Sequence, residues 1–159
     1  MPLSDIDIRF YESLPEEAKQ DWLFERTACD ASLYYFSVQM GSFTTKAGAD
    51  ASLAIHKPVC DFLQDRTIQF KGVAMARAWL KSTIEKWLQL WDYLQNNETR
   101  NLLVSQKIDL PVSFVKFIKK QALTNVRLRY LYPVLHKITK AWKHSNSWGA
   151  AEVEFPRRG

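Results

Sequence analysis

Residues 70–84 limit most strongly what this chain can fold into. The stretch opens at Phe70 as an apolar run typical of a buried strand, and a tight connection then leads to Lys81-Ser82-Thr83. After these residues the apolar positions recur every three or four residues, as on one face of an α-helix. They are Ile84, Trp87, Leu88, Trp91 and Leu94. The stretch therefore predicts a strand, a turn and a helix in direct succession, with the helix ending at Asn96-Asn97.

A chain that turns from a strand into a helix in this way can bind phosphate. The helix N-terminus offers unpaired N–H groups, and a lysine beside them adds a positive charge. Lys81 would then contact the β- and γ-phosphates, while Ser82 or Thr83 would offer a hydroxyl to Mg²⁺. The standard pattern has glycine where Met75 and Leu80 stand here. An ordinary strand–helix unit with a Ser or Thr cap is therefore the alternative.

The composition suits one folded domain and sets few limits on its partners. Hydrophobic residues make up 47% of the 159 residues, but there are only five glycines, which argues against an all-β fold rich in tight turns. A net charge of +5 permits contact with nucleic acid without requiring it. Cys29 and Cys60 are too few for a disulfide framework, so we expect reduced thiols in a cytoplasmic protein. Neither a signal peptide nor an apolar run of membrane-spanning length is expected.

The rest of the sequence predicts further helices and a second strand. After an extended entry, helices are expected before the central unit in residues 1–20, 21–40 and 54–63. Beyond it, Asn101-Leu102-Leu103-Val104-Ser105 is typical of a buried parallel strand, and Asp109 can cap the next helix. Residues 152–155 alternate as a further strand would. Strand, helix, strand and helix in this order predict an α/β fold of the doubly wound kind.

Three further groups of side chains each allow a structural and a functional interpretation. The aromatic run Tyr34-Tyr35-Phe36 suits core packing better than a stacking platform for bases, because no basic residues are interleaved with it. His56 is either a structural histidine or a neighbour of a bound nucleotide. Basic residues in the second half form either a solvated face or a surface for the DNA backbone. They are Lys116, Lys119, Lys120, Arg127, Arg129, Lys137, Lys140 and Lys143.

Taken together, these pieces resemble the front part of the ATPase domain in the large subunits of tailed-phage terminases, the motors that pump DNA into proheads. In that family the loop commonly reads Pro-Arg-Gly-x-x-Lys-Ser-Thr, and here it reads Ala76-Arg77-Ala78-Trp79-Leu80-Lys81-Ser82-Thr83. Further similar segments are residues 56–63, 100–105 and 130–133, Trp148, and residues 152–157. The resemblance covers roughly residues 30–158 of this chain.

The resemblance implies a nucleotide site on residues 76–83, with ATP and Mg²⁺ as its ligands. Lys81 would bind the β- and γ-phosphates, and Ser82 would be the Mg²⁺ ligand with Thr83 beside it. Arg77 matches a loop arginine that contacts the γ-phosphate and helps to trigger hydrolysis, so it would be the catalytic residue. The remaining residues of the loop would be Ala76, Ala78, Trp79 and Leu80.

The resemblance also implies a fold and a domain organisation. We expect an α/β fold, with an incomplete P-loop parallel sheet flanked by helices. Residues 1–52 would form a helical N-terminal extension, and residues 53–159 the front part of the ATPase domain. The chain would stop before the acidic motif that such motors use to hold Mg²⁺ and polarise water. Ala78 stands where the family usually has glycine, and it would strain the loop by roughly 1 kcal/mol if that position needs a positive φ.

For the complete motor, the resemblance implies an ATPase with a nuclease domain that couples ATP hydrolysis to DNA translocation. Its expected partners are double-stranded DNA, the portal, the small terminase subunit and further copies of itself, in the host cytoplasm and away from any membrane. The chain alone would not be competent for hydrolysis. Two alternatives stay open: a non-catalytic basic module that binds DNA or protein, and a degenerate P-loop protein that binds nucleotide for regulation.

Overall fold

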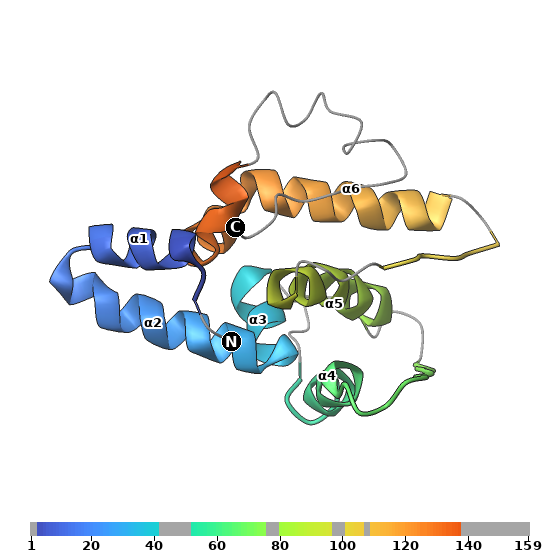
Figure 1. Ribbon diagram of the computed structural model, residues 1–159. Helices are drawn as coiled ribbons and strands as arrows, with labels where there is room; N and C mark the ends of the chain where they lie inside the picture. Colours follow the sequence, from blue (N-terminus) through green and yellow to red (C-terminus); the bar gives the residue numbers. More distant parts are fainter. Residues whose placement is uncertain (1–2, 42–51, 76–79, 97–100, 107–108, 138–159) are drawn as a thin grey trace.

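Helices are the regular elements of this chain (Figure 1). The computed structural model describes residues 3–41, 52–75, 80–96, 101–106 and 109–137. In chain order the helices are α1 (Asp5–Ser13), α2 (Glu16–Ala31), α3 (Leu33–Met40), α4 (His56–Gln64), α5 (Lys81–Gln95), α6 (Asp109–Thr124), α7 (Val126–Leu131) and the 3₁₀-helix η1 (Pro133–Lys137).

The predicted α/β fold with a parallel sheet is wrong, because none of the described ranges contains a β-strand. The two runs expected as strands, from Phe70 and from Asn101, are non-helical but belong to no sheet. Their apolar side chains lie in solvent: Phe70 is 91% exposed, Leu102 87% and Val104 83%. An extended run becomes a strand only when a second run shares hydrogen bonds with it, and apolar composition does not supply that partner. The third expected strand, residues 152–155, lies outside the described residues.

The amino-terminal segment is more helical than the sequence pattern indicated. Helix α1 occupies residues expected to be extended, and a capping box begins it. The Ser4 hydroxyl accepts a hydrogen bond from the Asp7 N–H, and the Asp7 carboxylate accepts one from the Ser4 N–H. The helix expected over residues 21–40 is divided into α2 and α3 at Ser32. This residue is extended, and its hydroxyl accepts a hydrogen bond from the Tyr35 N–H to cap α3.

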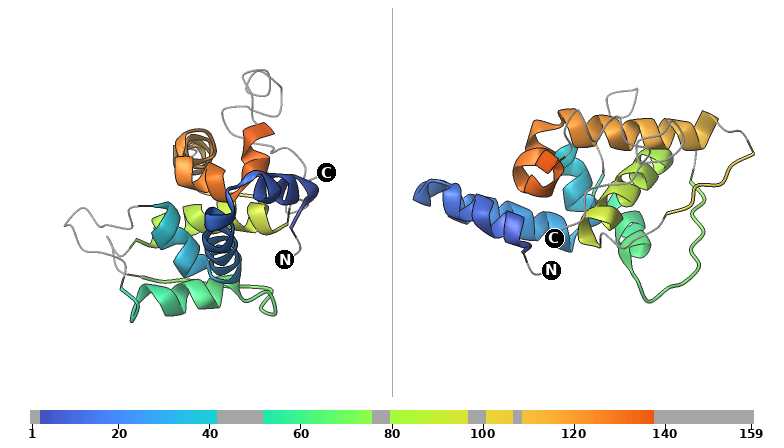
Figure 2. Two further views of the ribbon diagram at one scale, coloured as in Figure 1. Left: turned by 90° about the vertical axis from the view of Figure 1, so that its left-hand side faces the viewer. Right: turned by 45° about the horizontal axis from the view of Figure 1, so that its top comes forward.

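Helix α5 is the central helix, and its prediction from the apolar pattern is confirmed. It lies between α4 and α6 and also packs against α3 (Figure 2). Its buried residues are Ile84, Trp87, Leu90, Trp91, Leu94 and Gln95. The sequence pattern had assigned Leu88 to this face, but Leu88 is only half-buried and Leu90 takes its place in the core. The helices expected before and after this unit are confirmed as α4 and α6.

Aromatic rings fill the centre of the core, around Trp87. Phe36 lies edge-on to Trp87, with 5.7 Å between ring centroids, and edge-on to Tyr132 at 5.9 Å. Phe117 of α6 packs edge-on against Trp87 at 5.0 Å. These contacts confirm the core interpretation for Phe36. Just after α3, Gly41 passes so close to Trp87 that an added Cβ would lie 2.6 Å from the indole ring.

The domain boundary expected at residue 52 stays a prediction. The core draws side chains from both sides of that position, since Phe36 lies before it and Trp87 and Tyr132 lie after it. In the part of the chain that the structure describes, no helix is both long and apolar enough to cross a membrane.

Candidate functional site

The predicted phosphate loop falls partly within the described residues. Leu80, Lys81, Ser82 and Thr83 are described and lie together at the start of α5. The loop residues before them lie outside the described ranges; they are Ala76, Arg77, Ala78 and Trp79. The expected γ-phosphate contact of Arg77 and the expected strain at Ala78 are therefore predictions that rest on the sequence.

Leu80 has a left-handed backbone conformation directly before the lysine. Its φ is 59° and its ψ is 9°, and it is the one non-glycine residue in the described ranges with a positive φ. The phosphate-loop pattern has glycine at this position, and glycine adopts positive φ without strain. A leucine there costs roughly 1–2 kcal/mol. The sequence showed the missing glycine but gave no sign that the backbone conformation is present without it.

The first turn of α5 leaves backbone donors available. The Leu80 carbonyl accepts hydrogen bonds from the N–H groups of Thr83 and Ile84, both at 2.9 Å, and no side chain caps the helix. The N–H groups of Lys81 and Ser82 make no hydrogen bond to another described residue. The first turn also carries no acidic residue that would compete for these donors. An anion placed here would meet two N–H groups that have no partner among the described residues, a lysine and the positive end of the helix dipole.

The same residues are of the right kind to hold nucleotide phosphates with Mg²⁺. Mg²⁺ keeps several waters and takes most other ligands from the substrate phosphates, so one protein hydroxyl is a sufficient ligand. Ser82 is exposed in the first turn, and Lys81 beside it is half-buried. Elsewhere in the described ranges, no three His, Cys, Asp or Glu side chains gather as a metal site.

A hollow of about 260 Å³ lies beside the second and third turns of α5, at Glu85 and Gln89. Its walls come from α5, from the extended segment 101–106 and from the start of α6. The lining residues are Glu85, Gln89, Leu103, Val104, Ser105, Leu110, Pro111 and Phe114. Phe114 forms the buried floor at 4% exposure, whereas Val104 stands at the open rim. No pattern in the sequence indicated this hollow, because its walls come from three separate segments.

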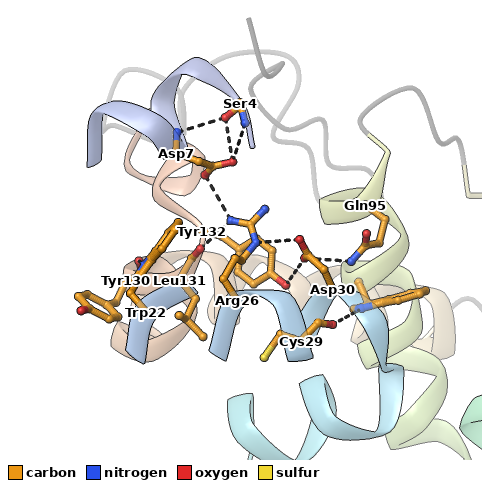
Figure 3. A network of polar contacts seen from close by, with 11 residues as sticks. Ser4, Asp7, Trp22, Arg26, Cys29, Asp30, Gln95, Tyr130, Leu131 and Tyr132 are labelled. Atoms are coloured by element: carbon orange, nitrogen blue, oxygen red, sulfur yellow. Dashed lines mark hydrogen bonds and ion pairs between the residues drawn. The ribbon is translucent and has the colours of Figure 1, made fainter. Parts of the chain in front are cut away.

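A second polar cluster surrounds the buried side chain of Arg26 (Figure 3). Arg26 is 1% exposed, and its guanidinium donates to Asp7 at 3.3 Å, to Asp30 at 3.1 Å and to the carbonyl of Leu131 at 2.7 Å. The guanidinium also stacks over the Tyr132 ring, 4.0 Å from its centroid. Burial alone would lower the pKa of Arg26, but the charges of Asp30 and Asp7 raise it.

The Arg26 cluster joins four helical segments and serves the fold. Asp30 also accepts hydrogen bonds from the Tyr132 hydroxyl at 2.9 Å and from the Gln95 side-chain amide at 3.1 Å. Burial raises the pKa of Tyr132, and the neighbouring Asp30 charge raises it further, so the phenol stays protonated. Every charged group in the cluster has a partner within the protein. Sequence reasoning missed the cluster because its members lie far apart along the chain.

The remaining candidate side chains have structural partners. The Nδ1 atom of His56 accepts a hydrogen bond from the Ser52 N–H at 2.8 Å, which accords with a structural histidine. Cys29 and Cys60 are buried free thiols, and burial raises the pKa of each to about 12. Thiols with such a pKa are protonated at neutral pH and therefore poor nucleophiles.

Two basic residues of the second half are engaged with other groups of the protein. Arg127 pairs with Glu25 at 2.8 Å, and Arg129 donates to the carbonyls of Ala122 and Leu135. Lys116 and Lys120 are exposed on α6. The last two of the series, Lys140 and Lys143, lie outside the described residues.

Comparisons with known proteins found no relative of this chain. No protein-family model matches this chain, and neither does a curated protein or a solved structure.

Proposed function

We propose that this chain is the nucleotide-binding front part of a viral DNA-packaging motor ATPase of the terminase large-subunit type. In the complete protein it would couple ATP hydrolysis to DNA translocation. One observation carries the proposal: Leu80 holds a left-handed backbone conformation directly before Lys81-Ser82-Thr83 at the start of α5. A strained backbone that the local sequence does not favour is a reason to look for a function at that place.

The described residues would divide the work of holding the phosphates. The N–H groups of Lys81 and Ser82 would donate to phosphate oxygens, and the Lys81 ammonium would neutralise charge on the β- and γ-phosphates. The Ser82 hydroxyl would join the Mg²⁺ coordination sphere. When bound, Mg²⁺ supplies charge that stabilises the transferring phosphoryl group. The role of Arg77 at the γ-phosphate rests on the resemblance alone.

The partners in the proposal also rest on the resemblance. They are double-stranded DNA, the portal, the small terminase subunit and further copies of the chain. The proposal rests on the start of α5 alone, because the described residues contain no strand of the kind that precedes the phosphate loop in such motors. The basic-module alternative gains no support from Arg127 and Arg129, since both guanidinium groups are engaged within the protein.

Titration of the purified chain with Mg-ATP, followed by tryptophan fluorescence, tests the proposal. Wild type is compared with Lys81→Ala and with the matched control Lys120→Ala, which removes an exposed lysine of α6. We expect saturable binding that Lys81→Ala weakens at least tenfold, because a charge-assisted phosphate contact is lost. Lys120→Ala should bind as wild type does. Equal affinity in all three folded proteins would overturn the proposed phosphate site.

A further inference from the structure

The hollow beside α5 is connected to the proposed phosphate site by one row of side chains. Lys81, Glu85 and Gln89 are spaced four residues apart, so they lie on the same face of the helix. With a rise of 1.5 Å per residue, Glu85 lies about 6 Å and Gln89 about 12 Å along the axis from Lys81. Glu85 and Gln89 both line the hollow. A ligand bound at the start of α5 can therefore extend along this face into the hollow.

The walls of the hollow are mixed in character, and each part would suit a different portion of such a ligand. Leu103, Leu110, Pro111 and Phe114 give it an apolar surface, which suits the flat face of a nucleobase. The polar groups come from Glu85 and Gln89 on α5 and from Ser105. In the described part of the chain, the Glu85 carboxylate and the Gln89 amide form no ion pair or hydrogen bond.

The charge of Glu85 decides which portion of a nucleotide lies beside it. A carboxylate repels phosphate oxygens but accepts hydrogen bonds from hydroxyl groups. Acidic residues bind the ribose hydroxyls of nucleotides in this way at other nucleotide sites. With the phosphates at the Lys81 end, the sugar comes next along the molecule and the base follows. The order of groups in a ribonucleotide thus matches the order Lys81, Glu85 and the apolar hollow.

We propose that the hollow between α5, segment 101–106 and α6 receives the nucleoside portion of the bound nucleotide, with Glu85 accepting hydrogen bonds from the ribose hydroxyls. This inference rests on the proposed function, because it takes the phosphates to be bound at the start of α5. It adds a preference for ribonucleotides over deoxyribonucleotides and assigns that preference to Glu85.

Calorimetric titrations with four probes in the presence of Mg²⁺ test the inference. The probes are ATP, 2′-deoxyATP, 3′-deoxyATP and inorganic tripolyphosphate. The proteins are wild type, Glu85→Ala and the matched control Glu17→Ala, which removes an exposed carboxylate of α2. In wild type, ATP should bind roughly tenfold more tightly than at least one deoxy analogue, because a charge-assisted hydrogen bond is lost. In Glu85→Ala this ratio should fall to about one, with tripolyphosphate bound no more weakly than in wild type.

The outcomes separate this inference from the proposed function. One outcome is that wild type binds tripolyphosphate and ATP equally well, and that Glu85→Ala changes neither the affinity of ATP relative to tripolyphosphate nor that of ATP relative to its deoxy analogues. The nucleoside then does not enter the hollow, although the phosphate site stands. If wild type binds neither ATP nor tripolyphosphate, the proposed function fails.

Adenosine then tests the hollow without phosphates, by saturation-transfer NMR at millimolar concentration. Val104 is the residue to change, because it is 83% exposed at the rim and an arginine there should leave the fold intact. Adenosine signals that vanish in Val104→Arg would support the nucleoside site. An absence of adenosine signals in folded wild type would overturn it.

Discussion

The polar groups around Arg26 and those at the start of α5 are arranged in opposite ways. Around Arg26, charged and polar side chains are buried and bonded to one another. At the start of α5, the N–H groups of Lys81 and Ser82 have no described partner, and the backbone at Leu80 is strained. A buried polar group without a hydrogen bond destabilises the fold, so the buried groups around Arg26 must bond to one another. The second region borders solvent and can keep its donors for a ligand.

This comparison separates polar groups that stabilise the fold from polar groups that could act on a ligand. Substitutions in the first region should lower stability. Substitutions at the start of α5 should change stability little and ligand affinity more. The predictions below test that division, from the largest expected effect to the smallest.

Arg26→Ala should cause the largest loss of stability. It leaves the buried carboxylates of Asp7 and Asp30 without their cation, and breaking a buried pair in this way costs about 3–5 kcal/mol. The free energy of unfolding from urea denaturation measures the effect. Arg9→Ala, which removes an exposed arginine of α1, should change it by less than about 0.5 kcal/mol. Similar small changes in both variants would show that the Arg26 cluster does not hold the helices together.

Gly41→Ala should cost about 1–3 kcal/mol through overpacking. The added Cβ would lie 2.6 Å from the buried ring of Trp87, which cannot move without disturbing Phe36 and Phe117. Thermal unfolding provides the measurement. Gly72→Ala is the matched control, because its Cβ would meet no atom within 4 Å, and its melting temperature should not fall. If the melting temperature of Gly41→Ala equals that of wild type, Trp87 does not lie against Gly41 as described.

Leu80→Ile should cost about 1 kcal/mol, because a β-branched side chain fits poorly at a positive φ. It conserves side-chain volume, so packing changes little. The same substitution at Leu123, in the last turn of α6, is the control and should cost only a few tenths of a kcal/mol. Tripolyphosphate binding should weaken in Leu80→Ile and not in Leu123→Ile. Identical stability and affinity in both variants would argue against the left-handed conformation of Leu80.

Asp92→Asn should have the smallest effect, with a sign that depends on pH. Burial raises the pKa of Asp92, although Arg66 and Lys71 oppose the shift. Because the folded pKa is the higher one, the stability contributed by this group is present at low pH. It is lost as the pH rises from the unfolded value near 3.8 through the folded pKa. Wild type should therefore lose stability relative to Asp92→Asn over that rise, by less than about 1 kcal/mol.

Urea denaturation of both proteins across this pH range measures the difference. Asp61→Asn on α4 is the control, because Asp61 is an i, i+4 partner of Lys57 and its side chain is more exposed than that of Asp92. A stability difference between wild type and Asp92→Asn that stays flat with pH would contradict the raised pKa of Asp92.

The sequence predicted α4, α5 and α6, because their signals are local, whereas α1 and α7 were not predicted. The apolar periodicity after Lys81 predicted α5, and Asp109 marked the start of α6. The capping box of Ser4 and Asp7 was also present in the sequence and could have predicted α1. The break at Ser32 likewise had a local cause in its capping hydroxyl.

The sheet and the polar cluster could not be predicted in the same way. Apolar runs at Phe70 and Leu102 indicated strands, but strand pairing depends on a partner segment that composition does not identify. The cluster joins Arg26 to residues as distant as Tyr132, and no local pattern connects them. The residue types at the start of α5 predicted a phosphate site there. The left-handed conformation of Leu80 became visible only in the backbone of the structure.

Helix α5 is bonded to α2 near its carboxyl end, while Ile84 and Trp87 pack its amino-terminal half into the core. In its last two turns, the Trp91 indole donates to the carbonyl of Cys29 at 2.8 Å, and Gln95 donates to Asp30. Its amino end, roughly 20 Å away along the axis, faces the proposed ligand. The hydrogen bonds at Trp91 and Gln95 therefore join the helix that carries the proposed site directly to α2, on which Cys29 and Asp30 lie.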